Sequence, residues 1–168
     1  EMIYPDQFIP VLEKNGYVID VDNFIWNKVC ACIKMMEDKG IEPVPISVNV
    51  SRMHVYQEKF TENLKNMAGE YGIDPKYIPL EITESAFTKE EGSLFKKVQS
   101  LQGYGFKFSM DDFGSGYSSL GMLKSERVDE VKIDKTFVDD IATDKGKVLL
   151  GNVIRMINEL GIDMIAEG

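Results

Sequence analysis

The sequence predicts an α/β fold with a mainly parallel sheet that belongs to a larger barrel. Short β-branched segments alternate with amphipathic helical segments, the expected strands begin near residues 44, 77, 106, 128 and 163, and polar residues recur where these strands end. A strand-to-strand spacing of 22 to 35 residues is typical of βα units, whose strands pair in parallel. The last strand is followed by no helix that would cover it, so we expect the chain to be a piece of the barrel.

The first half of the chain is expected to hold two helices and two strands. Apolar residues repeat with a helical period over 21–38, and Gly40 follows as a typical helix-ending residue. A β-branched run over 44–51 predicts a strand, followed by a helix over 57–71 and a strand over 77–83. The buried stripe expected for the first helix is Phe24, Ile25, Val29, Ile33 and Met36.

The second half continues the alternation of strands and helices. A glycine-containing loop is expected where the third strand ends, and it leads into a short helix. The last long helix has apolar residues at the 3.6-residue period, namely Val148, Leu149, Val153, Ile154, Ile157 and Leu160. The expected elements are a helix over 89–101, a strand over 106–110, the loop over 111–116, a short helix over 118–124, a strand over 128–133, a helix over 145–160 and a strand over 163–166.

Composition excludes several classes of protein. The chain has 168 residues, 43% of them hydrophobic, and a net charge of −9, so we expect one globular domain that binds neither a DNA or RNA polymer nor an anionic membrane surface. No apolar stretch is long enough to span a bilayer. Cys30 and Cys32 are two residues apart in a predicted helix and are interpreted as reduced thiols of a cytoplasmic protein.

Polar residues interrupt the apolar strands where the strands end, and this is the most informative feature of the sequence. Because the carboxyl ends of parallel barrel strands meet at one mouth, we expect these side chains to gather there. Taken one at a time, each acid is equally well explained as a helix N-cap, the lysine is more often a strand-edge residue, and the loop glycines could merely shape a turn. The ordered set of all of them favours a shared site instead. The residues concerned are Asn49, Glu81, Asp111, Asp112, Lys132 and Glu167.

The residue types predict the chemistry. Carboxylates with an amide oxygen are hard donors that suit Mg²⁺ or Mn²⁺, and the lone His54 leaves no zinc set. The adjacent Asp111 and Asp112 would let one carboxylate bridge two ions, and Lys132 would hold the attacking water or neutralise charge at phosphorus. The leading hypothesis is metal-assisted phosphodiester hydrolysis. His54 and Arg52 are interpreted as surface polar residues and Trp26 as a packing residue.

The chain closely resembles the EAL domain, the cyclic di-GMP phosphodiesterase of bacterial signalling. The motif MDDFGSGYSSLGMLK with the following DEVKIDKTFVDDI is specific to that family. The matching segments lie at 5–22, 47–51, 80–85, 110–124, 129–141 and 161–168, in the family's order.

This resemblance implies a modified (β/α)₈ barrel, similar to a TIM barrel, whose first strand is antiparallel to the others. It implies that Asn49, Glu81 and Asp111 hold a first metal ion and that Asp112 helps to hold a second. Lys132 would contact the nucleophilic water, and Glu167 would support the second ion or its water. Glu84 would not bind metal but would anchor the loop after the third strand. That loop, which couples metal, substrate and dimer interface, includes Phe113, Gly114, Ser115, Gly116 and Tyr117.

Residues that the family requires are absent from both ends of the printed chain. The motif that names the family would lie upstream of Pro5, and the chain stops within the family's EGVE motif at Gly168. We therefore expect residues 1–168 to be one partial EAL domain, active in its parent protein but impaired by itself. The parent would carry sensor or GGDEF domains and form a homodimer. A membrane anchor elsewhere in the parent is compatible with this expectation. The alternatives are an inactive cyclic di-GMP receptor, a protein-interaction module, or a fragment that completes its barrel through another copy.

Overall fold

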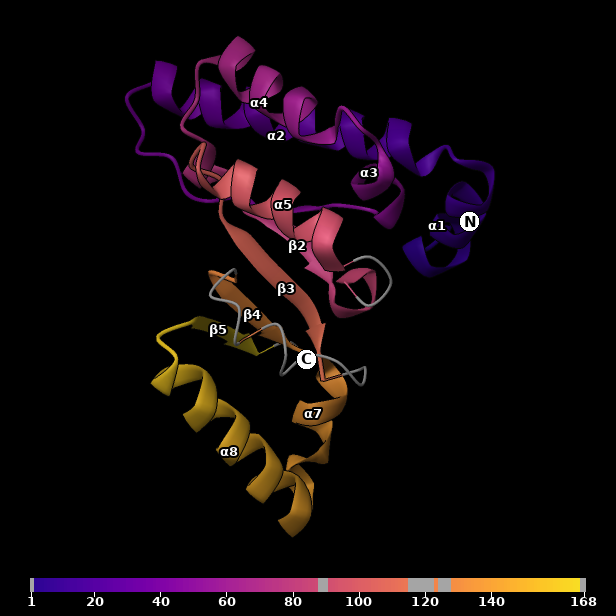
Figure 1. Cartoon of the computed structure of the whole chain (residues 1–168), viewed down its shortest axis with the longest axis vertical. Coiled ribbons are helices and arrows are strands. Elements are labelled where there is room, and N and C mark those ends of the chain that lie inside the picture. Colours follow the sequence, from indigo (N-terminus) through magenta and orange to yellow (C-terminus); the bar gives the residue numbers. More distant parts are fainter. Residues whose placement is uncertain (1, 88–90, 115–122, 124–127, 167–168) are drawn as a thin grey trace.

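Five parallel strands form a single sheet in which the strands lie in sequence order. Figure 1 shows the computed structural model, which describes residues 2–87, 91–114, 123 and 128–166. The order β1-β2-β3-β4-β5 with parallel pairing throughout is the arrangement of consecutive βα units and confirms the predicted fold class, a partial barrel of the TIM type. The strands are β1 (Val48–Asn49), β2 (Leu80–Thr83), β3 (Phe108–Phe113), β4 (Glu130–Ile133) and β5 (Asp163–Ala166).

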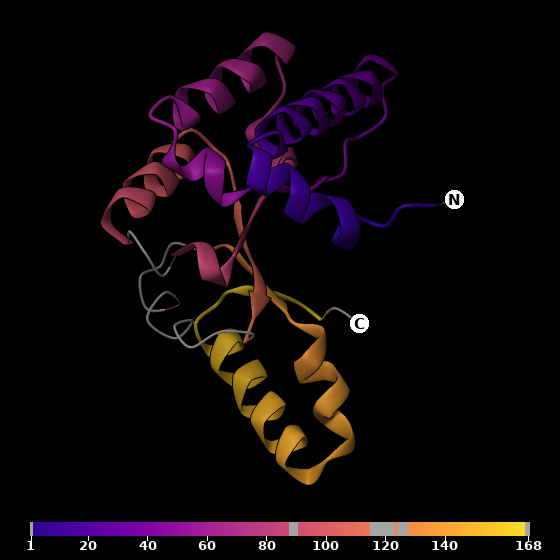
Figure 2. The same cartoon turned by 90° about the vertical axis from the view of Figure 1, so that its right-hand side faces the viewer.

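Helices follow the strands and cover them in two groups. Helix α2 packs on β1, α4 lies against both α2 and α5, and α8 packs on β5. Figure 2 shows α1 to α5 gathered on one side and α7 and α8 beside the far end of the sheet. The helices are α1 (Pro5–Asn15), α2 (Val18–Asp38), α3 (Arg52–Tyr56), α4 (Phe60–Tyr71), α5 (Glu91–Gln102), α7 (Lys135–Asp139) and α8 (Asp144–Glu159), with 3₁₀ turns η1 (Pro75–Tyr77), η2 (Glu84–Phe87) and η3 (Asp140–Ala142).

The hydrophobic core lies between the helices and one face of the sheet. Directly paired residues of parallel strands share a face, and the register pairs Leu80 with Phe108, Ile82 with Met110 and Met110 with Val131. All five side chains are buried. They pack with buried residues of the covering helices, namely Trp26, Cys30, Ile33, Phe60, Leu64, Leu94, Val98 and Leu101.

The face of α2 that is buried differs from the expected stripe. Phe24 and Ile25 are 62% and 45% exposed, whereas Ile33 is buried as expected. The helix buries positions spaced by four or three residues, and one of them is an acid, which a pattern of apolar residues does not reveal. The buried positions are Val18, Asp22, Trp26, Cys30 and Ile33.

Helix α8 buries only part of its apolar surface. Ile157 is buried as its period predicts, but Val148, Leu149 and Leu160 are exposed. The helix contacts β5, α7 and η3, and these neighbours cover a narrower stripe than the apolar residues span.

The remaining differences concern element boundaries. The strand expected over 44–51 is reduced to the two-residue strand β1, although the N–H groups of Ile46 and Val50 on either side also donate to the carbonyl oxygens of Tyr77 and Glu81. Helices α1 and α3 were not predicted; α1 is largely exposed and begins with Pro5, a favoured first helical residue. The strand expected over 106–110 extends to Phe113. The short helix expected over 118–124 lies, except for Leu123, outside the described residues.

Within the described residues, no helix is both long enough and apolar enough to cross a bilayer.

Two glycines of α8 provide a matched test of packing. A Cβ at Gly146 would overlap the carbonyl of Asp140, whereas a Cβ at Gly151 meets nothing within 4 Å. We expect Gly146→Ala to lower the free energy of unfolding by about 1–3 kcal/mol through overpacking. Gly151→Ala should raise it by about 0.5–1 kcal/mol, since alanine is the better helix former. Urea unfolding followed by circular dichroism measures both, and equal effects would contradict the packing of η3 on α8.

Candidate active site

The face of the sheet opposite the core is polar. The register aligns Asn49 with Glu81, Glu81 with Ser109, Ser109 with Glu130, and Glu130 with Asp163. Paired residues share a face, so these five polar side chains form a row across the whole sheet. A hydrogen bond of 2.8 Å from Ser109 Oγ to Glu130 Oε1 lies within this row.

Asp111 and Lys132 lie on the same face, one step nearer the carboxyl ends of the strands. Each follows a member of the row by two residues, and strand side chains alternate with a period of two. The carboxyl ends of parallel strands are where active sites are built in barrels of this type. The position of these residues therefore agrees with the sequence prediction.

Lys132 brings two of the predicted carboxylates together. Its Nζ lies 3.1 Å from Glu81 Oε1 and 3.5 Å from Asp111 Oδ1. The three side chains are only 13%, 9% and 16% exposed for Lys132, Glu81 and Asp111, respectively. Water screens such a cluster much less than it screens a surface ion pair, so the ammonium helps to compensate for placing two negative charges side by side.

An irregularity in β3 places Asp112 beside Asp111 at this position. The register pairs Met110 with Val131 but Phe113 with Ile133, so two aspartates oppose the single Lys132. Asp112 has a φ of 56°, and its N–H donates to Asp111 Oδ1 over 3.1 Å. In a regular strand, neighbouring side chains point to opposite faces. The extra residue of a bulge breaks that alternation and redirects side chains, as bulges beside active sites commonly do.

Glu84 anchors the chain that leaves β3. Its carboxylate is 1% exposed, and Oε2 accepts a hydrogen bond of 3.2 Å from the Gly114 N–H. On the other side, a Cβ at Gly114 would overlap the ring of Phe137 in α7, and the φ of 96° also favours glycine. Gly114 is therefore held between a buried acid and an aromatic ring. The contribution of Phe137 was not predicted, because no local sequence signal links it to Gly114.

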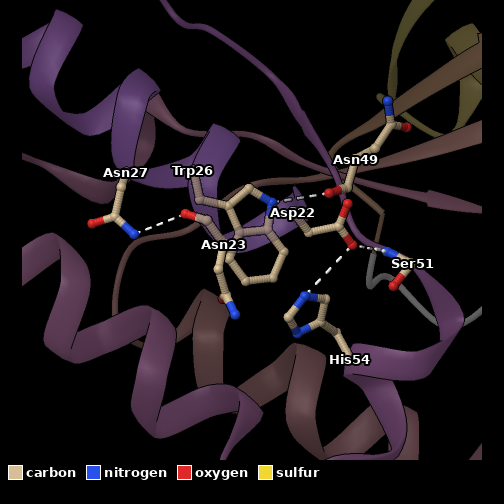
Figure 3. Close-up of polar contacts among 7 residues, drawn as sticks. All are labelled: Asp22, Asn23, Trp26, Asn27, Asn49, Ser51 and His54. Atoms are coloured by element: carbon tan, nitrogen blue, oxygen red, sulfur yellow. Dashed lines mark hydrogen bonds and ion pairs between the residues drawn. The ribbon is translucent and has the colours of Figure 1, made fainter. Parts of the chain in front are cut away.

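A buried polar cluster adjoins Asn49, as Figure 3 shows. The expectation that His54 is a surface residue is wrong: it is 2% exposed, and its ring centroid lies 4.3 Å from that of Trp26. His54 Nε2 lies 3.5 Å from Asp22 Oδ2. Burial lowers the pKa of His54 and raises the pKa of Asp22, while hydrogen bonds from Ser51 oppose the rise in Asp22. Trp26 is a packing residue, as expected.

The oxygen donors of the site fit a hard divalent ion in their chemistry. Glu81 and Asp111 both reach one cationic position, and Asn49 lies beside Glu81 in the register. In the part of the chain that the structure describes, no three His, Cys, Asp or Glu side chains are grouped as a metal-ligand set. Burial raises the pKa of the Cys30 thiol to about 11, so this cysteine is a protonated core residue and not a metal ligand.

Comparison with known proteins identifies the family. The model of the EAL domain matches residues 1–168. The chain belongs to the EAL domain family. Among its relatives, signaling protein YkoW of Bacillus subtilis is 33% identical over 165 residues, which cover 98% of this chain and 20% of YkoW. The bifunctional diguanylate cyclase/cyclic di-GMP phosphodiesterase MucR of Pseudomonas aeruginosa is 28% identical over 168 residues, covering 99% of this chain and 24% of MucR.

A solved structure is similar over nearly the whole chain. The structure of the PaMucR phosphodiesterase in complex with c-di-GMP is 28% identical and gives a TM-score of 0.91, covering 99% of this chain and 68% of that one. This EAL domain chain thus spans only about a fifth to a quarter of the two curated relatives. The resemblance stated from its motifs is confirmed.

The structure brings together some of the residues that the EAL resemblance implies. Glu81, Asp111 and Lys132 are in direct contact, and Asp112 adjoins them through the bulge. Asn49 is the register partner of Glu81, and its side chain is exposed. The predictions for Glu167, Ser115, Gly116 and Tyr117 fall outside the described residues.

His54 gives a prediction for the pH dependence of stability. Because burial lowers its pKa below the ordinary 6.5, the folded protein holds neutral His54 at pH values where the unfolded chain is already protonated. The stability that depends on neutral His54 is complete above the unfolded-state pKa and is lost as the pH falls toward the folded-state pKa. We expect the stability advantage of the wild type over His54→Gln to shrink as the pH falls through the ordinary histidine pKa of about 6.5 toward the lower folded-state pKa, by about 1.4 kcal/mol for each unit between the two pKa values.

Urea unfolding at a series of pH values measures this advantage. Asp22→Asn should show a pH dependence of opposite sign. Burial raises the pKa of Asp22, so protonation of its carboxylate at low pH relieves the cost of burying the charge and raises the stability of the wild type relative to this variant. A wild-type advantage over His54→Gln that stays constant with pH would contradict the prediction.

Proposed function

We propose that this chain belongs to a cyclic di-GMP phosphodiesterase that hydrolyses cyclic di-GMP to linear pGpG by metal-assisted in-line attack of water. The observation that carries the proposal is the cluster of Glu81, Asp111 and Lys132 on the polar face of the sheet, at the carboxyl ends of the strands. MucR, whose name includes this activity, and its structure in complex with c-di-GMP support the choice of substrate.

We propose a pair of Mg²⁺ or Mn²⁺ ions as the cofactor. Asn49, Glu81 and Asp111 would hold the first ion; Asp112 would help Asp111 to hold the second, and Glu167 would support it. Bound there, the ions would supply Lewis-acid stabilisation of charge on the phosphodiester oxygens. Support comes from the hard oxygen donors of the set and from the bulge that brings both aspartates to Lys132.

Lys132 is the proposed catalytic cation. Its ammonium nitrogen lies within 3.5 Å of two carboxylates, those of Glu81 and Asp111. A fixed positive charge at the strand ends would orient the attacking water through a hydrogen bond and would stabilise negative charge that develops at phosphorus. This positive charge would also attract an anionic substrate to the site, although the chain as a whole carries a net negative charge.

The segment after β3 is proposed to couple substrate and metal binding to the dimer interface. The contact between Glu84 and Gly114 supports an anchoring role for Glu84, and the proposed segment continues from Phe113 through Ser115, Gly116 and Tyr117. A buried carboxylate that accepts a backbone hydrogen bond can hold the beginning of such a segment at a fixed place above the site.

The remaining proposals concern the whole protein. We propose that residues 1–168 are one partial EAL domain with reduced activity by itself, within a cytoplasmic homodimer that also carries sensor or GGDEF domains. The name of MucR, which includes a diguanylate cyclase, and the 68% coverage of the MucR phosphodiesterase structure support this organisation.

A second candidate function is a receptor that binds cyclic di-GMP without cutting it. One observation favours it: Lys132 Nζ lies within 3.5 Å of both Glu81 and Asp111, the carboxylates that would hold the first ion. The receptor and the enzyme differ in turnover but not in binding, so a single pair of assays separates them.

Substitution of the charged cluster tests the enzyme. We expect Asp111→Asn and Lys132→Met to lower kcat by about two to three decades, the usual loss when one preorganised electrostatic group is removed. Lys135→Met is the matched control, because Lys135 lies three residues further on and pairs with Asp139 at the surface, with both side chains more than 60% exposed. Chromatography of the linear product with Mg²⁺ or Mn²⁺, with and without chelator, measures turnover.

Calorimetric titration with cyclic di-GMP accompanies this assay, on the 168-residue chain and on a longer natural protein that contains it. Binding without turnover in both would establish the receptor. Turnover that survives either substitution of the cluster would refute the proposed catalytic roles.

Glu84 gives a separate prediction about the loop. Because hydrogen bonds to charged groups contribute about 1.5–3 kcal/mol, Glu84→Gln should reduce kcat/KM by roughly ten- to a hundredfold. Glu62→Gln on the exposed side of α4 controls for the loss of a negative charge. Steady-state kinetics with a parallel melting curve measures the effect, and unchanged kinetics in a folded Glu84→Gln protein would exclude an anchoring role.

A further inference from the structure

Two side chains of α2, one helical turn apart, hold the backbone on both sides of Val50. Trp26 Nε1 donates to the carbonyl oxygen of Asn49 over 3.0 Å, and Asp22 Oδ2 accepts from the Ser51 N–H over 3.2 Å (Figure 3). Residues four apart lie on the same face of a helix, so α2 presents this donor and acceptor together to the end of β1. None of the roles assigned above to the active site includes these two contacts.

The Trp26 contact occupies the edge of β1 that faces away from β2. Val48 N–H and Val50 N–H donate to the carbonyl oxygens of Pro79 and Glu81, both over 2.9 Å. Alternate residues of a parallel strand direct their backbone groups to opposite edges, so the carbonyl of Asn49 points away from β2. There the indole N–H takes the place that a neighbouring strand would fill. Asn49 is thereby fixed from β2 on one edge and from α2 on the other.

The support is itself immobilised by packing. The ring of Trp26 is buried between His54, at a centroid distance of 4.3 Å, and Phe60, at 6.4 Å. Asp22 is also buried, and its Oδ2 lies 3.5 Å from Nε2 of the His54 imidazole. A side chain enclosed in this way loses little further entropy when it forms its hydrogen bond. It therefore holds the backbone group that it contacts in a fixed position.

We infer that Asp22 and Trp26 are positioning residues for the active site, which act by fixing Asn49 beside Glu81. The register makes Asn49 the direct neighbour of Glu81 on the polar face. A shift of the Asn49 backbone therefore changes the separation between its amide oxygen and the Glu81 carboxylate. The inference rests on the proposed metal-binding role of Asn49 and extends it to residues of the helical layer that never touch the substrate.

Trp26→Phe is the decisive variant, since it removes the N–H donor while keeping an aromatic ring in the core. We expect it to weaken the affinity of the protein for Mn²⁺ about five- to tenfold, the usual scale for one lost hydrogen bond. Electron paramagnetic resonance of free Mn²⁺ measures this affinity without any turnover. Asn27→Ala is the control, because Asn27 is the next residue of α2 and donates to Asn23 O within the helix and not to β1.

A double-mutant cycle separates positioning from a general loss of stability. If Trp26 acts through Asn49, Trp26→Phe has no further effect on Mn²⁺ affinity in a protein that already carries Asn49→Ala. If it acts only on stability, it lowers the melting temperature in both backgrounds and leaves the Mn²⁺ affinity of the folded protein unchanged, which overturns the inference. Asp22→Ala, which removes the acceptor of the Ser51 N–H, repeats the cycle should Trp26→Phe not fold.

Hydrogen exchange tests the positioning without metal. Trp26→Phe should speed exchange of the Val50 amide, and an unchanged rate at Val50 overturns the inference. A wild-type chain that binds no Mn²⁺ refutes the proposed metal site, whereas faster exchange at Val50 in the same protein still supports the fixing of Asn49. The two failures are therefore distinguishable.

Discussion

The active-site face of the sheet depends on one continuous register across five parallel strands. That register places Leu80, Ile82 and Met110 under the helices and Glu81 with Asp111 on the opposite face. Because the side chains alternate with a period of two, a slip of one residue would exchange the two sets. Burying an unpaired carboxylate among apolar side chains costs several kcal/mol, in addition to the apolar area returned to water. The hydrophobic core and the charged cluster therefore specify the same strand pairing, because charged side chains are disfavoured on the core face and apolar side chains on the polar face.

The register is interrupted only where the site needs it, within the strands that the structure describes. The bulge in β3 lets Asp111 and Asp112 oppose one residue of β4, at the cost of a left-handed conformation at Asp112. Such strained conformations cost about 1–3 kcal/mol each and persist where the surrounding structure enforces them. Here the ladder on one side and the contact between Glu84 and Gly114 on the other enforce it. Local strain and the convergence of acidic side chains thus have the same structural origin.

The sequence was sufficient to predict the parallel sheet and the strand-end position of Glu81, Asp111 and Lys132, because both follow from local periodicity and from polar residues inside apolar runs. It was not sufficient to predict the bulge, since an extra residue is defined only relative to the partner strand. Nor did it predict that Asp22 and His54 are buried. Polar residues on an amphipathic helix are normally read as exposed, and only tertiary contacts with Ser51 and Trp26 reveal their partners. Helix α1 was not predicted either, and in the structure its residues are largely exposed.

The shielding of Lys132 has a consequence for the ionic strength at which the site remains assembled. At the surface, the pair of Lys34 and Asp38 has side chains that are 42% and 63% exposed, so dissolved ions reach both partners. Salt at physiological concentration reduces the Debye length to about 8 Å and weakens such pairs, but it acts much less on charges that water barely reaches. The attraction between Lys132 and the carboxylates of Glu81 and Asp111 therefore persists at salt concentrations that weaken the surface ion pairs. Ionic strength should therefore change how readily an anionic ligand approaches the acidic surface of the protein. It should hardly change the arrangement of the charged side chains in the site.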